Sequence, residues 1–431
     1  MDAAQTPRVE RVFALIDGNS FYCSCERAFA PALNGRPVIV LSNNDGCAVA
    51  RTPEAKALGI AMGAPFFKIR DLCRKNHVAV FSSNYTLYGD MSRRMNEIYH
   101  QFSPVVEVYS IDESFLDITG LGSGNYVAYG QQLRQTVRAW TGIPTCVGIG
   151  PTKTLAKLAN RTAKNHAELN GVCDFSDLAT REKFLPATLV GELWGVGAAS
   201  AAKLKAIGVE TVGQLRALDP KRGRQLLTVV GERMIHELNG IACLALETLP
   251  AGRKGIAVTR SFGRPVTSLE EMQQAVAAYA TRAAEKLRRH GLCAVQGFVF
   301  MHTNAFNGDK WSHTGKPVEF LEPTDDTQEL VAAATKAAAA AWGQGYRYAK
   351  AGIMLTELVP ITMVQTSMLA TIDRAQRARL NQALDAINLR FGRHTLVPAA
   401  AGLKPSWSTK FDRKSPCFTT RWEELPEVAA A

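Results

Sequence analysis

The chain alternates between apolar and polar segments whose spacing predicts strands and helices in turn. The first strong element, residues 12–16, is an apolar run that stops at Asp17 and predicts a buried strand. Two later strand-like runs are joined by the short polar turn 110–114. The elements predicted for this first part are strands over 12–16, 38–41, 48–50, 105–109, 115–118 and 145–149, and helices over 54–59, 85–101, 126–140 and 152–165.

The order of these elements, and the pattern that follows them, predict an α+β protein with several domains. Strand, insertion, helix, hairpin, helix and strand is the order of a ferredoxin-like split βαβ unit with a lobe inserted after the first strand. Residues 178–239 read as short helices broken by glycines, and 252–258 as a linker running into strand-like sequence. A second α+β domain is predicted from helices over 269–289 and 330–341 and strands over 294–302 and 351–358. After Pro360 the pattern weakens into a tail.

Composition adds a basic surface to this picture. The chain has 431 residues, of which 46% are hydrophobic and 21% charged, and a formal net charge of +11. Within residues 201–264 there are 11 Lys or Arg against 5 Asp or Glu. Such an excess suits binding to phosphates, although a basic protein without any nucleic-acid role would give the same net charge. No apolar leader and no membrane-length apolar run occur, so we expect a cytoplasmic protein that does not contact a membrane and that, if its basic surface binds DNA, associates with the nucleoid.

Three carboxylates are candidates for metal chemistry. Asp17 ends the first strand, and Asp112 and Glu113 lie in the turn of the predicted hairpin, so all three can meet at one edge of a split βαβ sheet. Neighbours in a regular strand point to opposite faces, so Asp112 and Glu113 can share a site only if the backbone bends there. Converging carboxylates repel each other unless hard divalent cations such as Mg²⁺ bind them. The alternative is that Asp17 only ends a strand and that the turn is simply solvated.

The sequence around these carboxylates resembles the signature motifs of the Y-family DNA polymerases. Within that family it is most similar to the UmuC-type branch, whose members resemble the catalytic subunit of bacterial DNA polymerase V. The resemblance covers roughly residues 11–425 in the same order. The segments that carry it are DGNSFY at 17–22 followed by Cys25-Glu26, SNNDGC at 42–47, YSIDESFLD at 109–117, GIGPTKTLAK at 148–157 and RSFG at 260–263.

The resemblance implies a right-hand polymerase with ferredoxin-like palm, small fingers, helical thumb, α+β little finger and C-terminal tail. The implied boundaries are palm 10–20 and 82–172, fingers 21–81, thumb 173–241, little finger 254–358 and UmuC-type tail 359–431. The implied activity is error-prone translesion synthesis, the addition of deoxynucleotides to a primer opposite damaged DNA, in the bacterial SOS response. The implied partners are primer-template DNA, a dNTP, a UmuD′-type dimer and a recombinase filament.

The family also assigns roles to residues of the active site. Two Mg²⁺ ions are expected on Asp17, Asp112, Glu113 and the carbonyl of Gly18. Tyr22 matches the position whose ring would clash with a ribose 2′-OH. The other expected nucleotide-binding residues are Phe21, Arg51, Lys56 and Lys157. Pro53 stands where many relatives have a phosphate-binding tyrosine, and Lys56 where many have arginine, so this part of the phosphate site departs from the family.

Two further segments are expected to bind macromolecules. Residues 193–208 look like a helix-hairpin-helix, in which Gly195, Val196 and Gly197 would present backbone N–H groups to DNA phosphates. Arg260, in the RSFG segment, is also expected to contact DNA. QTSML at 365–369 resembles a sliding-clamp peptide, with Gln365, Met368 and Leu369 as anchors, although phenylalanine is more usual at the last position. The alternative for this peptide is a plain linker.

Two other function classes compete with a polymerase. A nucleotide cyclase uses a similar palm and similar carboxylates, but it has no need for a basic helical domain. A non-catalytic DNA-binding subunit would not need the three carboxylates. Primer extension with magnesium separates all three possibilities.

Overall fold

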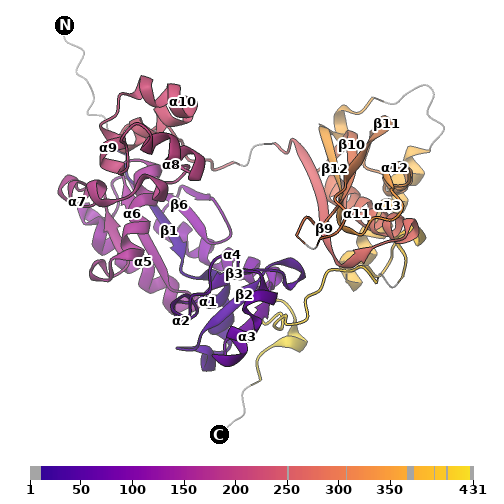
Figure 1. The fold of residues 1–431 in the computed structure, drawn as a ribbon, viewed down its shortest axis with the longest axis horizontal. Coiled ribbons are helices and arrows are strands. Elements are labelled where there is room, and N and C mark those ends of the chain that lie inside the picture. The colour runs from indigo at the N-terminus through magenta and orange to yellow at the C-terminus, as the bar shows by residue number, and fades with distance from the viewer. Residues whose placement is uncertain are drawn as a thin grey trace. The chain divides into compact units, whose positions relative to one another are not determined.

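The computed structural model describes residues 11–249, 252–306, 308–365, 373–392, 394–403 and 406–427. They form two compact units (Figure 1). The first contains residues up to 42, residues 46–250 and the segment from Arg413 onward; the second contains 43–45 and 251–412. The chain therefore leaves the first unit, builds the second and then returns to the first.

The strands fall into three sheets, with orders β5-β6-β1-β7-β8, β3-β2-β4 and β11-β10-β12-β9. The strands are β1 (Phe13–Gly18), β2 (Val38–Leu41), β3 (Ala48–Arg51), β4 (Ala79–Ser82), β5 (Val106–Val108), β6 (Glu113–Asp117), β7 (Thr145–Gly150), β8 (Val172–Asp174), β9 (Gly255–Val266), β10 (Leu292–Thr303), β11 (His313–Thr324) and β12 (Tyr348–Pro360).

The α-helices occur in both units. They are α1 (Phe21–Phe29), α2 (Pro53–Ala57), α3 (Phe66–Lys75), α4 (Tyr85–Phe102), α5 (Tyr126–Thr141), α6 (Lys153–Asn165), α7 (Leu178–Phe184), α8 (Ala198–Lys205), α9 (Val212–Arg216), α10 (Pro220–Leu238), α11 (Leu269–Arg289), α12 (Thr327–Ala341) and α13 (Arg374–Phe391). Within the described ranges, no helix is both long enough and apolar enough to cross a lipid bilayer.

The five-stranded sheet has the predicted split βαβ topology, and its two faces are covered by different helices (Figure 1). Strand β1 is central and runs antiparallel to both β6 and β7. Successive residues of a strand point to opposite faces. Ala14 and Ile16 accordingly share a core with residues of α4 and α5, whereas Phe13 and Leu15 pack with residues of β6 and α6. Asp17 continues the second series and lies on the side of α6.

Helix α6 lies close against β7 because Gly148 has no side chain. A Cβ atom on Gly148 would be 2.0 Å from the backbone nitrogen of Asn160, which is in α6. The side-chain amide of Asn160 donates to the carbonyls of Leu15 and Cys146, at 3.2 and 2.7 Å. These contacts fix the helix that carries Lys157 and Lys164 over the end of β1.

The rest of the first unit consists of a small sheet and a helical region. The sheet β3-β2-β4 lies inside the range expected for the fingers. Helices α7–α10 contribute to one apolar core, which Leu155 and Leu158 of α6 also join. These elements fall within the expected palm, fingers and thumb, but their division into separate subdomains stays a prediction.

The second unit has one four-stranded sheet, against which α11 and α12 pack. Here the structure differs from the sequence prediction in three places. The linker expected over 252–258 already contains the start of β9, and β11 had not been predicted. The tail expected after Pro360 contains α13, an 18-residue helix.

Polar contacts hold α13, which explains why its apolar pattern is weak. Arg374 forms ion pairs with Glu322 and Glu329, both at 2.7 Å. Asp385 binds Arg288 at 2.7 Å. Asn381, in the middle of the helix, is buried and donates to Asp326 at 2.8 Å.

Candidate active site

Asp17 and Glu113 are directly opposite each other on the antiparallel strands β1 and β6. Residues opposite each other in such a pair project from the same face of the sheet. Both carboxylates therefore point to the side that α6 covers. The structure thus brings these two predicted residues together at one end of the sheet.

Each of the two carboxylates is bound by a lysine of α6. Lys164 Nζ lies 2.6 Å from Asp17 Oδ2, and Lys157 Nζ lies 2.9 Å from Glu113 Oε2. Lys157 also sits over the rings of Tyr109 and Trp194, at 4.5 and 5.1 Å from their centroids. The lysines partly neutralise charges that would otherwise repel each other.

The surroundings of Asp17 shift the pKa of its carboxyl. Burial raises the pKa of its carboxyl to about 7, against the attraction of Lys164, and the negative charges of Glu113 and Asp112 raise it further. A carboxylate that is influenced by two other carboxylates lies in a concentration of negative charge. Such a place favours a bound cation.

Asp112 lies in a bend just before β6. Because the backbone is irregular there, the adjacent carboxylates of Asp112 and Glu113 can serve one site. Gly18 N donates to the carbonyl of Asp112 at 2.9 Å, so the bend is fastened to the end of β1. Ser110 Oγ donates to Asp112 Oδ1 at 2.6 Å and accepts from the N–H of Glu113 at 3.0 Å. The backbone thus turns between Asp112 and Glu113, and regular alternation does not apply there.

The carboxylate and carbonyl oxygens at this edge suit magnesium, although their side chains are not arranged around one common point. Among the residues that the structure describes, no group of three or more His, Cys, Asp or Glu is arranged to hold a metal ion. Lys164 and Lys157 occupy the carboxylate oxygens instead. Carboxylate and carbonyl oxygens are the ligands that Mg²⁺ prefers, so Asp17, Asp112, Glu113 and the Gly18 carbonyl fit such an ion chemically.

A hollow of about 450 Å³ opens beside these carboxylates. It is lined by cations and aromatic rings as well as by Asp17 and Asp112. Most predicted nucleotide-binding residues line it, but Lys157 and Glu113 do not. The lining residues are Asp17, Gly18, Ser20, Phe21, Tyr22, Val49, Ala50, Arg51, Lys56, Met62, Tyr85, Asp112 and Lys164.

Lys164 is the lining cation that sequence reasoning missed. It follows Lys157 by seven residues, which is two helical turns, so both lysines lie on the same face of α6. That spacing was a usable signal. Arg51, by contrast, was expected here, and its Nη1 donates to the carbonyl of Ile60 at 2.7 Å.

Tyr22 lines the hollow and is held in a cluster of tyrosines. Its ring stacks on Tyr88 with centroids 4.5 Å apart and planes 15° apart, and it meets Tyr85 edge-on at 5.9 Å. Burial, followed by the effect of Tyr85, raises the pKa of Tyr22 to about 12, so its hydroxyl stays protonated at neutral pH. Tyr88 and Tyr85 thus contact the ring of Tyr22, the candidate steric gate against a ribose 2′-OH, and Tyr85 also lines the hollow.

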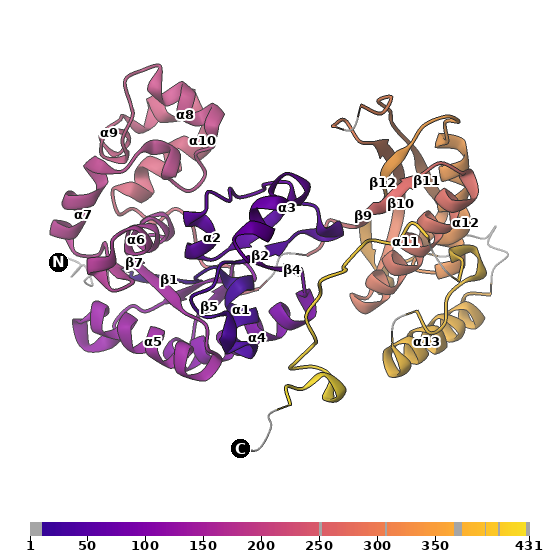
Figure 2. The same cartoon turned by 60° about the horizontal axis from the view of Figure 1, so that its bottom comes forward.

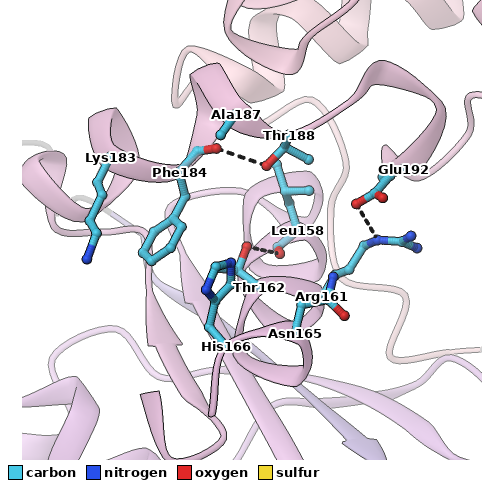
Figure 3. Close-up of a pocket in the computed structure, with 10 residues that line it drawn as sticks. All are labelled: Leu158, Arg161, Thr162, Asn165, His166, Lys183, Phe184, Ala187, Thr188 and Glu192. Carbon is cyan, nitrogen blue, oxygen red and sulfur yellow. Dashed lines mark hydrogen bonds and ion pairs between the residues drawn. The ribbon is translucent and has the colours of Figure 1, made fainter. Parts of the chain in front are cut away.

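A second hollow, of about 330 Å³, lies between α6 and the segment that follows α7 (Figure 3). Two of its basic side chains have acidic partners, and a third, Lys183, lies over the ring of Phe184 at 5.0 Å. Arg161 binds Glu192 at 3.0 Å, and His166 contacts Glu168 at 3.1 Å. The ring of Phe184 closes one side against His166, with centroids 4.9 Å apart. We assign this hollow no ligand.

The expected DNA-binding glycines form a tight turn before α8. Gly195 has φ +87°, a backbone conformation that favours glycine. Gly197 is the N-cap of α8, and no side chain caps that helix end. Arg260 is an exposed residue of β9 in the second unit. The first turn of α8 can thus offer backbone N–H groups to a phosphate.

The clamp-peptide prediction is only partly covered. Gln365 is exposed and lies outside any helix or strand. Met368 and Leu369 are outside the described residues. The peptide stays a prediction.

Comparison with known proteins gives the family. Residues 16–161 match the impB/mucB/samB family, and residues 253–368 match the C-terminal domain of that family. Residues 378–428 match a domain of unknown function, DUF4113. Protein ImpB and Protein UmuC, both from Salmonella typhimurium, are each 42% identical over 422 residues. Those matches cover 96% and 97% of this chain and 99% and 100% of the two relatives.

More distant matches point the same way. A protein named DNA polymerase IV from Moorella thermoacetica is 29% identical over 399 residues, 90% of this chain and 95% of that protein. A solved Y-family DNA polymerase chimera of Dbh and Dpo4 matches the fold with a TM-score of 0.65 at 16% identity, over 81% of this chain and 99% of that one.

The matches to both family domains and the 42% identity to ImpB and UmuC show a Y-family DNA polymerase, and the fold agrees with this class. Within that class, the chain belongs to the impB/mucB/samB family, which includes UmuC. The predicted α+β fold class, the resemblance to the UmuC-type branch and the activity of a DNA-directed, translesion-class DNA polymerase are therefore confirmed. Its substrates are DNA and nucleotides.

Proposed function

We propose that this polymerase adds deoxynucleotides to a primer 3′ end opposite damaged DNA, using Asp17, Asp112, Glu113 and the Gly18 carbonyl to hold two Mg²⁺ ions. The observation that carries the proposal is the pairing of Asp17 with Glu113 beside a cationic hollow. When bound, Mg²⁺ would lower the pKa of the primer 3′-hydroxyl and stabilise the leaving pyrophosphate.

Residues of the hollow, together with Lys157 of α6, would supply the remaining contacts to the nucleotide. Arg51, Lys56 and Lys164 provide positive charge for a triphosphate. Tyr22 and Phe21 lie where the sugar would enter, and Tyr22 excludes a ribose 2′-OH by its volume. Lys157 holds Glu113 and can exchange that contact for a phosphate once a metal is bound. Pro53, at the start of α2, has no hydroxyl to offer.

Contacts outside the hollow would hold the template duplex. The backbone N–H groups around Gly195, Val196 and Gly197 and the basic residues of the thumb favour phosphate contacts that are blind to sequence. Arg260 belongs to the same proposal on the second unit. Binding through Gln365, Met368 and Leu369 to a sliding clamp, and to a UmuD′-type dimer and recombinase filament in the SOS response, rests on the family alone.

Primer extension tests the chemistry directly. Purified protein with Mg²⁺, dNTPs and a lesion-bearing primer-template should extend the primer, and Asp112→Ala should lower the rate at least about 100-fold, the usual scale for losing charge stabilisation of a transition state. Primer-template affinity should stay within a few-fold. Glu97→Ala removes an exposed carboxylate of α4 that pairs with Arg93 and serves as the control.

Two outcomes would contradict the proposal. Substantial extension by Asp112→Ala would remove Asp112 from the metal site. Production of a cyclic nucleotide, with no primer extension under any condition, would favour the cyclase alternative.

A further inference from the structure

The segment that follows Asp412 returns to the first unit and packs beside α1 and α4 (Figure 2). Ser82, the last residue of β4, donates its N–H to the carbonyl of Arg413 at 3.0 Å, and its hydroxyl accepts from the N–H of Arg413 at 2.9 Å. The Arg413 guanidinium also lies 5.6 Å from the ring of Phe66. The segment is thus joined to the small sheet through backbone atoms as well as side chains.

Ser415 enters a buried hydrogen-bond cluster. The Asn84 amide donates to the carbonyl of Ser415, to its hydroxyl and to the carbonyl of Pro416, at 3.0, 3.0 and 3.1 Å. The Ser415 hydroxyl donates to Glu26 Oε1 at 2.9 Å, and the Tyr88 hydroxyl donates to the same oxygen at 2.7 Å. Glu26 is only 1% exposed, so its carboxyl relies on these donors in place of water.

This cluster lies directly behind Tyr22. Tyr88 shares Glu26 Oε1 with Ser415 and stacks its ring on Tyr22 at 4.5 Å. Glu26 and Tyr22 are four residues apart on α1, one turn of the same helix. Asn84 is the N-cap of α4, the helix that carries Tyr88. The segment therefore touches both helices that hold the gate.

A second contact strengthens the attachment to α1. Phe418 stacks on Phe29, the last residue of α1, with centroids 5.0 Å apart and planes 15° apart. Cys417, between the two contacts, is buried beside Asn84. The segment thus holds α1 at Glu26 and at its C-terminal end.

We propose that Ser415 and the segment 413–418 position the Tyr22 gate, so that part of the region matching a domain of unknown function contributes to the choice of sugar. Ser415 acts through Glu26 and Tyr88 and does not touch the nucleotide. This inference rests on the proposed role of Tyr22 as the gate.

The physical reason lies in the stiffness of the ring stack. A gate discriminates by volume only if its ring cannot move aside when a 2′-OH arrives. Removal of the Ser415 hydroxyl leaves Glu26 Oε1 with one donor fewer in a buried place, and the carboxylate and Tyr88 then have room to rearrange. Tyr22, which loses a fixed neighbour, would yield to a ribonucleotide more easily.

The experiment compares the kcat/KM ratio for a dNTP and the matching rNTP in full-length variants. Ser415→Ala should lower this ratio on the order of three- to tenfold, the size expected when one hydrogen bond to a charged group is lost and only part of its effect reaches the gate. Thr420→Ala removes an exposed side chain two residues after this segment and should leave the ratio unchanged. Ser415→Thr keeps a hydroxyl and should restore most of the ratio.

A double-mutant cycle tests the route. If Ser415 acts through Glu26, Ser415→Ala combined with Glu26→Gln should change the ratio less than the product of the two single effects. In a Tyr22→Ala background, Ser415→Ala should have no further effect on the ratio.

The outcomes separate this inference from the function it rests on. If Tyr22→Ala leaves ribonucleotide exclusion intact, the gate assignment fails and this inference with it. If Tyr22→Ala admits ribonucleotides while Ser415→Ala does not change the ratio, only this inference is overturned. An equal loss of dNTP and rNTP incorporation in Ser415→Ala would also overturn it, because it would show a structural role without any effect on sugar choice.

Discussion

Asp17 and Glu113 occupy opposite positions on β1 and β6, and two lysines of one helix bind them, Lys164 and Lys157 respectively. A single helix thus places two cations, seven residues apart, over two carboxylates on neighbouring strands. Under the proposed function, Lys164, which lines the hollow, would lie next to the triphosphate of a bound nucleotide. The same lysine would then serve both the carboxylate and the substrate.

Lys164→Met should weaken nucleotide binding. Lys164 lines the hollow, and loss of one charge-assisted contact of about 1.5 kcal/mol corresponds to roughly a tenfold rise in the KM for dNTP. Steady-state primer extension at saturating DNA measures it. Lys75→Met, at the exposed end of α3, is the control. An unchanged KM in Lys164→Met would mean that this lysine only neutralises Asp17.

Tyr22→Ala should admit ribonucleotides. Release of a steric clash of about 1–3 kcal/mol corresponds to a roughly five- to 150-fold loss of sugar discrimination. Single-nucleotide insertion with dNTP and rNTP in parallel gives the ratio. Tyr22→Phe keeps the ring and should discriminate like the parent. Loss of discrimination in that variant would show that the hydroxyl of Tyr22, and not the volume of its ring, excludes the ribonucleotide.

Glu26 should make the stability of the first unit depend on pH. Burial raises the pKa of its carboxyl, an effect that the hydrogen bonds from Tyr88 and Ser415 only partly offset. Between the ordinary value of about 4.3 and the raised folded value, the native state holds a proton that the unfolded chain has released. The stability from this group is therefore complete below the ordinary pKa and is lost as pH rises through the folded pKa.

Glu26→Gln removes that titration. The melting temperature of the variant minus that of the parent should rise as the pH is raised from the ordinary glutamate pKa of about 4.3 to neutral, because only the parent loses stability as its carboxyl releases the proton. Thermal melts across this range measure it, and Glu97→Gln, which changes an exposed carboxylate, should give a flat difference. A flat difference for Glu26→Gln as well would show that its carboxyl titrates normally.

The clamp peptide should matter only when a clamp is present. Replacement of Gln365, Met368 and Leu369 together with alanine should reduce clamp-dependent processivity and leave distributive extension unchanged. Peptides of this kind place a few apolar anchors in a preformed pocket, and Leu369 fills less volume than the usual phenylalanine. Leu369→Phe should therefore strengthen the response to clamp. If the triple variant responds like the parent, the peptide is a linker.

Much of the palm could be predicted because its chemistry is local in sequence. The apolar run before Asp17 and the hairpin turn around Asp112 and Glu113 fix a strand end and a bend, and a split βαβ topology then brings them together. The sequence did not predict which lysine pairs with which carboxylate. Lys164 was visible as a lysine two turns after Lys157, but the close contact between α6 and β7 depends on Gly148 and becomes evident only in three dimensions.

The second unit was harder to predict for a different reason. Strand β11 is the edge strand next to β10 and contains Gly315, Pro317 and Pro323, residues that normally argue against a strand but are tolerated at a sheet edge. Helix α13 is held by ion pairs from Arg374 and Asp385, so it lacks the apolar stripe on which helix prediction relies. Both elements are stabilised by residues distant in sequence, and local sequence patterns do not show such contacts.

The return of the chain to its first unit has a consequence for synthesis. Residues 413–427 leave the ribosome only after the whole second unit has been translated, yet they supply the donor for Glu26 and the acceptors for Asn84. The catalytic unit is therefore incomplete throughout nearly all of translation. A nascent chain stalled before Arg413, or a message with a late nonsense codon, would yield a polymerase in which the carboxylates are intact but the support behind Tyr22 is missing.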